Sequence, residues 1–275
     1  MRAVPFAGPF GAEVLDLDLA DPLAVTAAAP DLRRLLATHR LLLWRVPDLA
    51  AERQIGLMRT FGPVLDESGT GAEWTLVSNV ADGGRLGDGE YLFHFDLEFT
   101  PTPLEVISLY ALEVPERPTH TRFADGVRAA RRLDPRTRAD LTGRSARHVY
   151  PLTDARGDRR YRLADLDPGA PSAEHPLLWA HPVTGEIVLT ATAMQTDTVL
   201  GVDEAVGEEL LTRAWAVLYD ARNVVRHEWR VGDLVVWDNR ALQHARDAVL
   251  GRRTLRRVPV GEFAVTLRTD SGPGS

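Results

Sequence analysis

Three side chains that can bind a divalent metal stand in two separate parts of the chain. His94 and Asp96 are two residues apart within the apolar run from Tyr91 to Phe99, and His244 follows a second apolar stretch. If the first run is a strand, alternation places His94 and Asp96 on one face. Two imidazoles and one carboxylate on one side of a metal leave coordination positions for other ligands, as in non-haem Fe(II) oxygenases. The sequence therefore predicts an iron site formed by His94, Asp96 and His244.

Each part of this set has a simpler interpretation when it is taken alone. A His and an Asp two residues apart more often form a structural hydrogen bond than a metal site, and a single His after a strand is more often structural. The prediction depends on the third ligand arriving from a distant part of the chain. Asp238 and Asn239, which follow the apolar stretch, are expected to shape the turn that presents His244.

Two arginines near the C-terminus predict an anion site. Arg253 and Arg257 are four residues apart, so on a strand they share a face, while Arg252 and Arg256 lie on the opposite face or near solvent. Buried arginines are unfavourable unless they meet anions, and a guanidinium binds a carboxylate through two parallel hydrogen bonds. The alternative is a solvated, arginine-rich edge strand that opposes aggregation.

Composition excludes several other classes of site. The chain has no cysteine, which rules out disulfides, thiolate nucleophiles and cysteine-based zinc or iron–sulfur centres. A net charge of −7 argues against a broad nucleic-acid surface. No apolar run reaches the roughly 18 residues of a membrane span, and the first residues do not resemble a signal peptide. We therefore expect a cytoplasmic protein with no membrane or nucleic-acid partner.

Hydrophobic periodicity gives a chain with many strands and few helices. Strands are predicted at 11–19, 41–44, 74–79, 104–112, 186–190, 233–237 and 255–267, and helices at 31–39, 51–61, 126–133, 137–141 and 204–219. Because helices and strands do not alternate regularly, the fold class is mainly β with flanking helices, a β-sandwich or jelly roll. We expect one domain over 1–270 and a flexible tail at 271–275. The Gly-rich segment 66–92 is either a lid or a variable surface loop.

Together these residues resemble the TauD/TfdA-like family of 2-oxoglutarate oxygenases. The resemblance covers nearly the whole chain and is carried by 11–14, 61–63, 109–115, 181–185, 236–240 and 252–257, with the ordered set of His94, Asp96, His244, Arg253 and Arg257. It implies a double-stranded β-helix core, which is a cupin-like jelly roll. It also implies that the cofactors are Fe(II), 2-oxoglutarate and O2, and that the two histidines and Asp96 bind the iron.

The resemblance further assigns the arginines and a threonine. Arg253 and Thr121 match the residues that hold the distal carboxylate of 2-oxoglutarate. Arg257 matches an arginine that faces an acidic group of the substrate or lies beside the cosubstrate. The family usually has Gly-Gly-Asp-Thr where this chain has Pro118 to Thr121, so the turn is rebuilt and Thr119 is the alternative contact. The segment between His244 and Arg253 is also shorter than in the family's namesakes.

The implied function is a dioxygenase that hydroxylates a C–H bond of a small acidic or amino-acid-like metabolite, with succinate and CO2 as coproducts. The substrate would be anionic or zwitterionic, and Glu90 and Tyr91, just before the iron motif, are candidate substrate contacts along with Arg257. Asp96 argues against halogenation, in which a small residue replaces the carboxylate. Desaturation, cyclisation or dealkylation remain open, as does a homo-oligomer. The competing functions are a cupin-like metal enzyme without O2 chemistry and a non-catalytic small-molecule binder.

Overall fold

A seven-stranded sheet forms one wall of the fold. The structure, a computed structural model, describes residues 1–81, 87–153 and 156–262. The sheet has the strand order β1 (Arg2–Pro5), β2 (Ala12–Leu15), β3 (Leu41–Arg45), β14 (Asp233–Asp238), β6 (Val106–Glu113), β16 (Thr254–Val260) and β4 (Thr75–Ser78). All neighbouring strands are antiparallel except the parallel pair of β2 and β3.

A four-stranded antiparallel sheet forms the opposite wall. Its order is β13 (Val224–Glu228), β7 (His120–Asp125), β15 (Leu242–Arg246) and β5 (Tyr91–His94). Between the two walls lies a hydrophobic core in which Leu109, Trp237 and Leu255 of the larger sheet pack with Phe123 and Leu242 of the smaller one. Two facing, mainly antiparallel sheets that enclose one core form a jelly roll, as the sequence predicted.

The continuous apolar run of β14 packs into a hydrophobic core on each of its two faces. Leu234 and Val236 pack in a core formed with α1 (Pro22–Ala27), α2 (Ala29–His39) and α3 (Ala51–Met58), whereas Val235 and Trp237 point between the two sheets. Burying such a side chain stabilises the fold by about 1.5–3 kcal/mol. The run therefore fixes the register of a strand that ends at the turn leading to His244.

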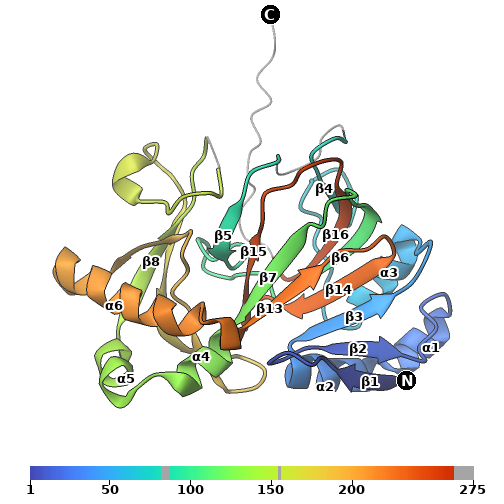
Figure 1. Ribbon diagram of the computed structural model, residues 1–275, viewed down its shortest axis with the longest axis horizontal. Coiled ribbons are helices and arrows are strands. Elements are labelled where there is room, and N and C mark those ends of the chain that lie inside the picture. The colour runs from blue at the N-terminus through green and yellow to red at the C-terminus, as the bar shows by residue number, and fades with distance from the viewer. Residues whose placement is uncertain (82–86, 154–155, 263–275) are drawn as a thin grey trace, which may run out of the picture.

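The remaining elements lie beside this sandwich, on the left in Figure 1. They include a three-stranded sheet of β12 (Thr196–Val199), β8 (Ser145–Val149) and β9 (Ser172–Pro176), and a hairpin of β10 (Leu178–Ala180) and β11 (Ile187–Leu189). The helices here are α4 (Gly126–Arg132), α5 (Pro135–Leu141) and α6 (Glu204–Leu218), with the 3-10 turns η1 (Leu163–Asp165) and η2 (Ala221–Asn223). Residues from these helices, β8, β11 and β12 share one apolar cluster.

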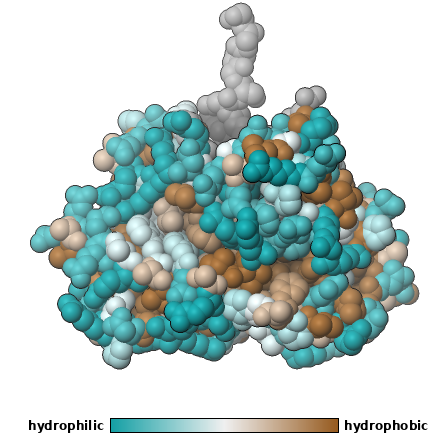
Figure 2. Space-filling view, in the orientation of Figure 1, coloured by the Kyte–Doolittle hydropathy of each residue, from teal (hydrophilic) through white to brown (hydrophobic). Residues whose placement is uncertain are grey.

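One face of the molecule carries a mixture of hydrophilic and hydrophobic residues. On the face drawn in Figure 2 hydrophilic residues predominate, with smaller hydrophobic groups between them. Across the ranges that the structure describes, no helix has the length and apolarity needed to cross a membrane. The tail expected at 271–275 and the part of the expected last strand beyond residue 262 lie outside the described residues, and so do 82–86 of the segment considered as a lid.

Gly126, the first residue of α4, offers a test of how tightly α4 packs against β11 and the segment before β15. A Cβ at this position would lie 2.6 Å from a Val188 methyl and 2.9 Å and 3.1 Å from the backbone oxygens of Leu189 and Ala241. Backbone atoms cannot move aside easily, so Gly126→Ala should lower the free energy of unfolding by about 1–3 kcal/mol. Gly56→Ala is the control, because nothing lies within 4 Å of its Cβ, and it should not destabilise. Urea unfolding measures both, and equal stability of the two variants would contradict the packing.

Candidate metal centre

The three predicted metal ligands lie together at the β5 edge of the smaller sheet. His94 is the last residue of β5 and His244 lies on the adjacent strand β15, where the two are paired in register. Asp96 lies beyond the end of β5, so the prediction that it shares a strand face with His94 is wrong in that detail. The backbone turns after His94 and brings the carboxylate back toward the two imidazoles.

The donor atoms of this group converge. One donor atom from each of His94, Asp96 and His244 lies within 4.8 Å of the others. Oδ1 of Asp96 is 3.4 Å from Nε2 of His94 and 3.8 Å from Nε2 of His244. Nδ1 of His94 is 2.8 Å from the carbonyl oxygen of Leu92, which can only accept, so Nδ1 carries the hydrogen and, in the neutral ring, Nε2 keeps its lone pair. This is the tautomer that a metal ligand needs.

Electrostatics favour the protonation states that bind a metal. Burial, together with the neighbouring His94, lowers the pKa of His244 to about 3, so its imidazole is neutral near pH 7. Burial alone would raise the pKa of Asp96, but Arg257 and the two histidines outweigh it and hold that pKa well below its usual value. A carboxylate and a neutral imidazole are the forms that coordinate a cation.

Asp96 is held from two sides. Its Oδ2 accepts a hydrogen bond from Nη1 of Arg257 at 2.6 Å, which leaves Oδ1 facing the histidines. Asn239, fully buried in the turn after β14, accepts from the backbone N of Asp96 at 3.1 Å and donates to the carbonyl of Asp96 at 3.1 Å and that of Leu104 at 2.9 Å. The turn that leads to His244 therefore also positions Asp96.

Removing the Asn239 side chain should disturb the site as well as the fold. Asn239→Ala leaves buried backbone groups of Asp96 and Leu104 without these bonds, and we expect it to lower the free energy of unfolding by about 1–3 kcal/mol. Because it releases the backbone of Asp96 on one side, it should also weaken Mn(II) binding at least about tenfold. Asn223→Ala is the matched control, since Asn223 is also buried and donates to two carbonyls, of Asp125 and Leu218. Unchanged Mn(II) affinity in Asn239→Ala, measured by calorimetry, would assign Asn239 a purely structural role.

A cavity of about 180 Å³ opens beside the three ligands. Both walls of the jelly roll contribute to it. Its lining combines apolar and aromatic residues with polar and charged ones: Glu67, Val77, Tyr91, His94, Asp96, Leu97, Phe99, Leu109, Thr121, Tyr150, Met194, Gln195, Trp237, His244, Arg246, Arg253 and Arg257.

One end of this cavity carries buried positive charge. Arg253 is 3% exposed, and within 1–81, 87–153 and 156–262 no carboxylate pairs with it. Burial, with Arg246 nearby, lowers the pKa of Arg253 to about 9. The Nε atoms of both arginines are buried without a hydrogen-bond partner among these residues. Such an arrangement suits an incoming carboxylate, which would restore the lost solvation.

Neighbouring groups position this positive end. Thr121 lies directly opposite Arg246 on adjacent strands, so both side chains share a face, and the Thr121 hydroxyl accepts from Nε1 of Trp229 at 2.9 Å. Asn79 accepts from the backbone N of Arg253 at 2.9 Å. Thr119, the alternative to Thr121, is buried but does not line the cavity. Arg246 was missed from the sequence, although its spacing of two from His244 on a strand could have revealed it.

The three candidate substrate contacts have different surroundings. Tyr91 lines the cavity, and the guanidinium of Arg246 lies 4.8 Å from its ring centroid. Arg257 also lines the cavity but is paired with Asp96 and with Glu67. Glu90 does not line it, and its carboxylate pairs with Arg122 at 2.9 Å. A direct contact between Glu90 and a substrate therefore has no support in this geometry.

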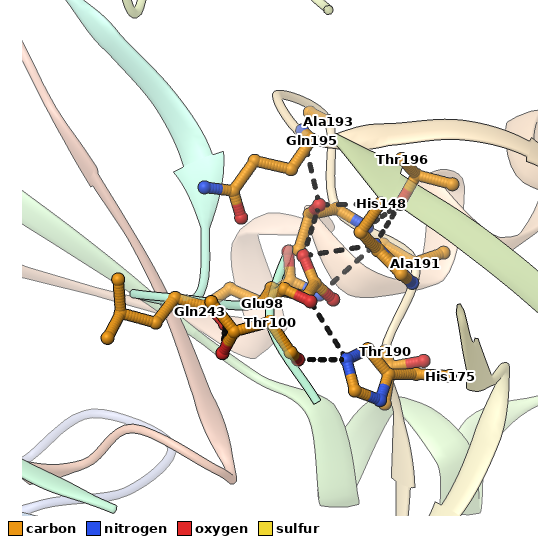
Figure 3. A network of polar contacts seen from close by, with 12 residues as sticks. Glu98, Thr100, His148, His175, Thr190, Ala191, Ala193, Gln195, Thr196 and Gln243 are labelled. Carbon is orange, nitrogen blue, oxygen red and sulfur yellow. Dashed lines mark hydrogen bonds and ion pairs between the residues drawn. The ribbon is translucent and has the colours of Figure 1, made fainter. Parts of the chain in front are cut away.

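A buried polar network centred on Glu98 adjoins the cavity (Figure 3). Oε2 of Glu98 accepts from Thr192 at 2.7 Å and lies 3.2 Å from Nδ1 of His148. With its amide nitrogen turned toward Glu98, Gln195 donates to Oε2 at 3.2 Å and to the Phe95 carbonyl at 2.9 Å. The network thus joins a cavity-lining residue to the segment that follows the candidate carboxylate ligand.

Five other histidines have partners away from the three candidate ligands. Their partners are Asp247 and Glu228 for His120, Glu98 for His148, the carbonyls of Glu98 and Thr100 for His175, Asp238 for His181 and Asp233 for His227.

Comparisons with known proteins agree with this arrangement. The model of the family described as taurine catabolism dioxygenase TauD, TfdA family matches residues 2–258. The chain is 31% identical to an alpha-ketoglutarate-dependent 2,4-dichlorophenoxyacetate dioxygenase of Cupriavidus pinatubonensis, with 93% of this chain and 96% of that protein covered. It is 28% identical to an (S)-phenoxypropionate/alpha-ketoglutarate-dioxygenase of Sphingobium herbicidovorans over 87% of each chain. Among solved structures, AAD-2 in complex with Mn(II) and N-oxalylglycine has a TM-score of 0.79 and 25% identity, covering 96% of this chain and 98% of that one.

Proposed function

Because this chain belongs to the taurine catabolism dioxygenase TauD, TfdA family, it is an Fe(II)- and 2-oxoglutarate-dependent dioxygenase, and we propose that it oxidises a C–H bond of a small molecule held in the cavity beside His94, Asp96 and His244. The observation that carries this is the convergence of three ligand atoms next to a buried arginine that has no carboxylate partner among the described residues.

In this proposal the chain's residues divide into two sets. His94, Asp96 and His244 hold Fe(II), since two imidazoles and one carboxylate on one side fit that ion and leave positions open. Arg253, Thr121 and Arg246 hold the distal carboxylate of 2-oxoglutarate, because they line the same cavity and no carboxylate of the described residues pairs with the buried Arg253. Bound Fe(II), with 2-oxoglutarate and O2, supplies the oxidation, and succinate and CO2 are the coproducts.

The protein's own contribution is positioning and exclusion of water. The apolar walls of the cavity, including Phe99, Leu109 and Trp237, keep the reacting bond away from solvent. Arg257 and Asn239 fix the orientation of Asp96. No acid–base pair is required. Hydroxylation is the outcome that we propose, and the carboxylate at Asp96 argues against halogenation.

The finer expectation of an acidic or amino-acid-like substrate loses its basis in this geometry. It depended on Arg257 as an anion site and on Glu90 as an amine site, and both side chains are already in ion pairs. We therefore propose a small-molecule substrate without that restriction. The sequence alternatives, a metal enzyme without O2 chemistry and a non-catalytic binder, are not carried further because the family is one of dioxygenases.

We also propose the single oxygenase domain over 1–270 that the sequence predicts, of which the structure describes residues up to 262 apart from 82–86 and 154–155. The first strand, β1, and the last, β16, belong to the same seven-stranded sheet, so the chain between them closes a single structure.

The proposed function is tested by following succinate. The protein supplied with Fe(II), O2 and 2-oxoglutarate should release succinate, and omission of Fe(II) should stop the release. Under anaerobic conditions the Fe(II) and 2-oxoglutarate complex should show a weak visible charge-transfer band. A protein that binds Fe(II) but gives neither succinate nor this band would contradict the proposal.

A further inference from the structure

The guanidinium of Arg257 donates hydrogen bonds to two carboxylates of the protein itself. Its Nε and Nη2 donate to the two carboxylate oxygens of Glu67 at 2.9 Å and 3.0 Å, and its Nη1 donates to Asp96 at 2.6 Å. Two parallel hydrogen bonds of this kind are how an arginine binds a carboxylate. The side of Arg257 that could hold an acidic group of a substrate is therefore occupied by Glu67.

Glu67 is built into this position. The side chains of Glu67 and Arg257 are 9% and 10% exposed, so the pair is shielded from solvent. The preceding residue, Asp66, accepts hydrogen bonds from the backbone N of Ser68, Gly69 and Gly71, at 2.7–2.9 Å, which fixes the turn. Glu67 therefore faces the cavity from a hydrogen-bonded turn, and separating it from Arg257 would break a buried ion pair, which is costly.

The rest of the cavity offers little else for a second acid. Arg253 and Arg246 lie at the end that the proposed function assigns to 2-oxoglutarate. The cavity wall also includes the apolar residues Val77, Leu97 and Leu109, and Leu109 lies directly opposite Arg257 on the adjacent strand. A substrate that reaches this wall contacts apolar side chains and an arginine whose charge is balanced by Glu67 and Asp96.

We propose that Glu67 is a specificity-determining residue, which occupies the anion-binding side of Arg257 so that the substrate presents an uncharged group to this wall. This inference rests on the proposed function, since it concerns the substrate of the same site. It makes the substrate class neutral and largely apolar at that end.

The test compares an acid with its uncharged amide. The probes are 2,4-dichlorophenoxyacetate and 2,4-dichlorophenoxyacetamide, titrated by calorimetry into protein loaded with Mn(II) and N-oxalylglycine. The unaltered protein should bind the amide at least tenfold more tightly than the acid. Glu67→Gln and Glu67→Ala should bind the acid at least tenfold more tightly than the unaltered protein, with amide affinity changed less than about threefold. The alanine variant frees Nε and Nη2 of Arg257, while Nη1 stays bonded to Asp96, and the glutamine variant keeps the side-chain shape.

Glu73→Gln is the matched control. It removes a carboxylate from the same segment, but Glu73 pairs with Arg59 and does not line the cavity, so acid binding should stay as in the unaltered protein. Variants of Glu67 that bind the acid no better than the unaltered protein would overturn the inference. So would an unaltered protein that binds the acid as tightly as the amide, because the acid would then be displacing Glu67.

Failure of the proposed function looks different. In that case the unaltered protein would not bind N-oxalylglycine or release succinate from 2-oxoglutarate, whatever residue stands at position 67. A failure confined to Glu67 leaves both of those properties intact and changes only the conclusion about the substrate.

Discussion

Replacing His244 by alanine is expected to abolish stoichiometric Fe(II) binding and the succinate release that depends on it. His244 supplies one of three converging ligand atoms, and the remaining two, on His94 and Asp96, cannot hold the ion in a fixed geometry. Even residues that only orient metal ligands change affinity by about 10–100-fold, so loss of a ligand should exceed about 100-fold. Metal content after anaerobic reconstitution and Mn(II) titration measure the effect.

The control for this variant is another buried histidine. His181 is 4% exposed and pairs with Asp238 but does not line the cavity, so His181→Ala should lose stability and still bind one Fe(II). Since the pKa of His244 lies near 3, its imidazole binds the metal without first releasing a proton at pH 7. Full turnover in His244→Ala would contradict the assignment of the site.

The sequence could predict the metal centre because its parts are local patterns. The apolar run of β14 predicts a strand, and its end at Asp238 predicts the turn that leads to His244. The detail that failed is the strand face shared by His94 and Asp96. β5 ends at His94, and Leu97 adopts a positive φ of 60°, so the chain turns where alternation predicted that it would continue.

The contacts that could not be predicted from the sequence are those between side chains on elements far apart in the chain. Nothing near Glu67 indicates that it turns inward to meet Arg257, which is 190 residues away in sequence. Asn239 was assigned to its own turn, whereas its amide also holds the backbone of Asp96. Such contacts depend on how the two sheets face each other, and local periodicity carries no information about that.

Arg256 illustrates the part of the strand pattern that succeeded. It was placed on the face opposite Arg253 and Arg257, and it lies there, where its Nε donates to Gln54 of α3 at 2.7 Å. Composition alone could not separate these arginines, because all 32 basic residues of the chain are arginine. Strand alternation separated them, and the structure shows that each face supplies a different kind of partner.

Replacing Arg253 by leucine is expected to weaken 2-oxoglutarate binding by at least about 100-fold, since truncating one partner of a buried charged hydrogen bond costs roughly 2–5 kcal/mol. The free protein should respond differently. The lowered pKa of Arg253 means that folding disfavours its charged form when no anion is bound, so leucine should leave the unfolding free energy unchanged or higher. This combination distinguishes a ligand-binding arginine from a structural one, whose loss would weaken the fold.

The neighbour of Arg253 provides the control for that variant. Arg252 is exposed and pairs with Glu113 at the surface, so Arg252→Leu removes the same charge one residue away and should leave 2-oxoglutarate affinity unchanged. Arg253→Lys keeps the charge but cannot form two parallel hydrogen bonds to a carboxylate, so we expect an intermediate affinity for 2-oxoglutarate. Calorimetry with Mn(II) and 2-oxoglutarate measures binding, and urea unfolding of the free protein measures stability. If Arg253→Leu lost stability while binding 2-oxoglutarate normally, the buried charge would serve the fold, and the cosubstrate would have to be held by Arg246 and Thr121 instead.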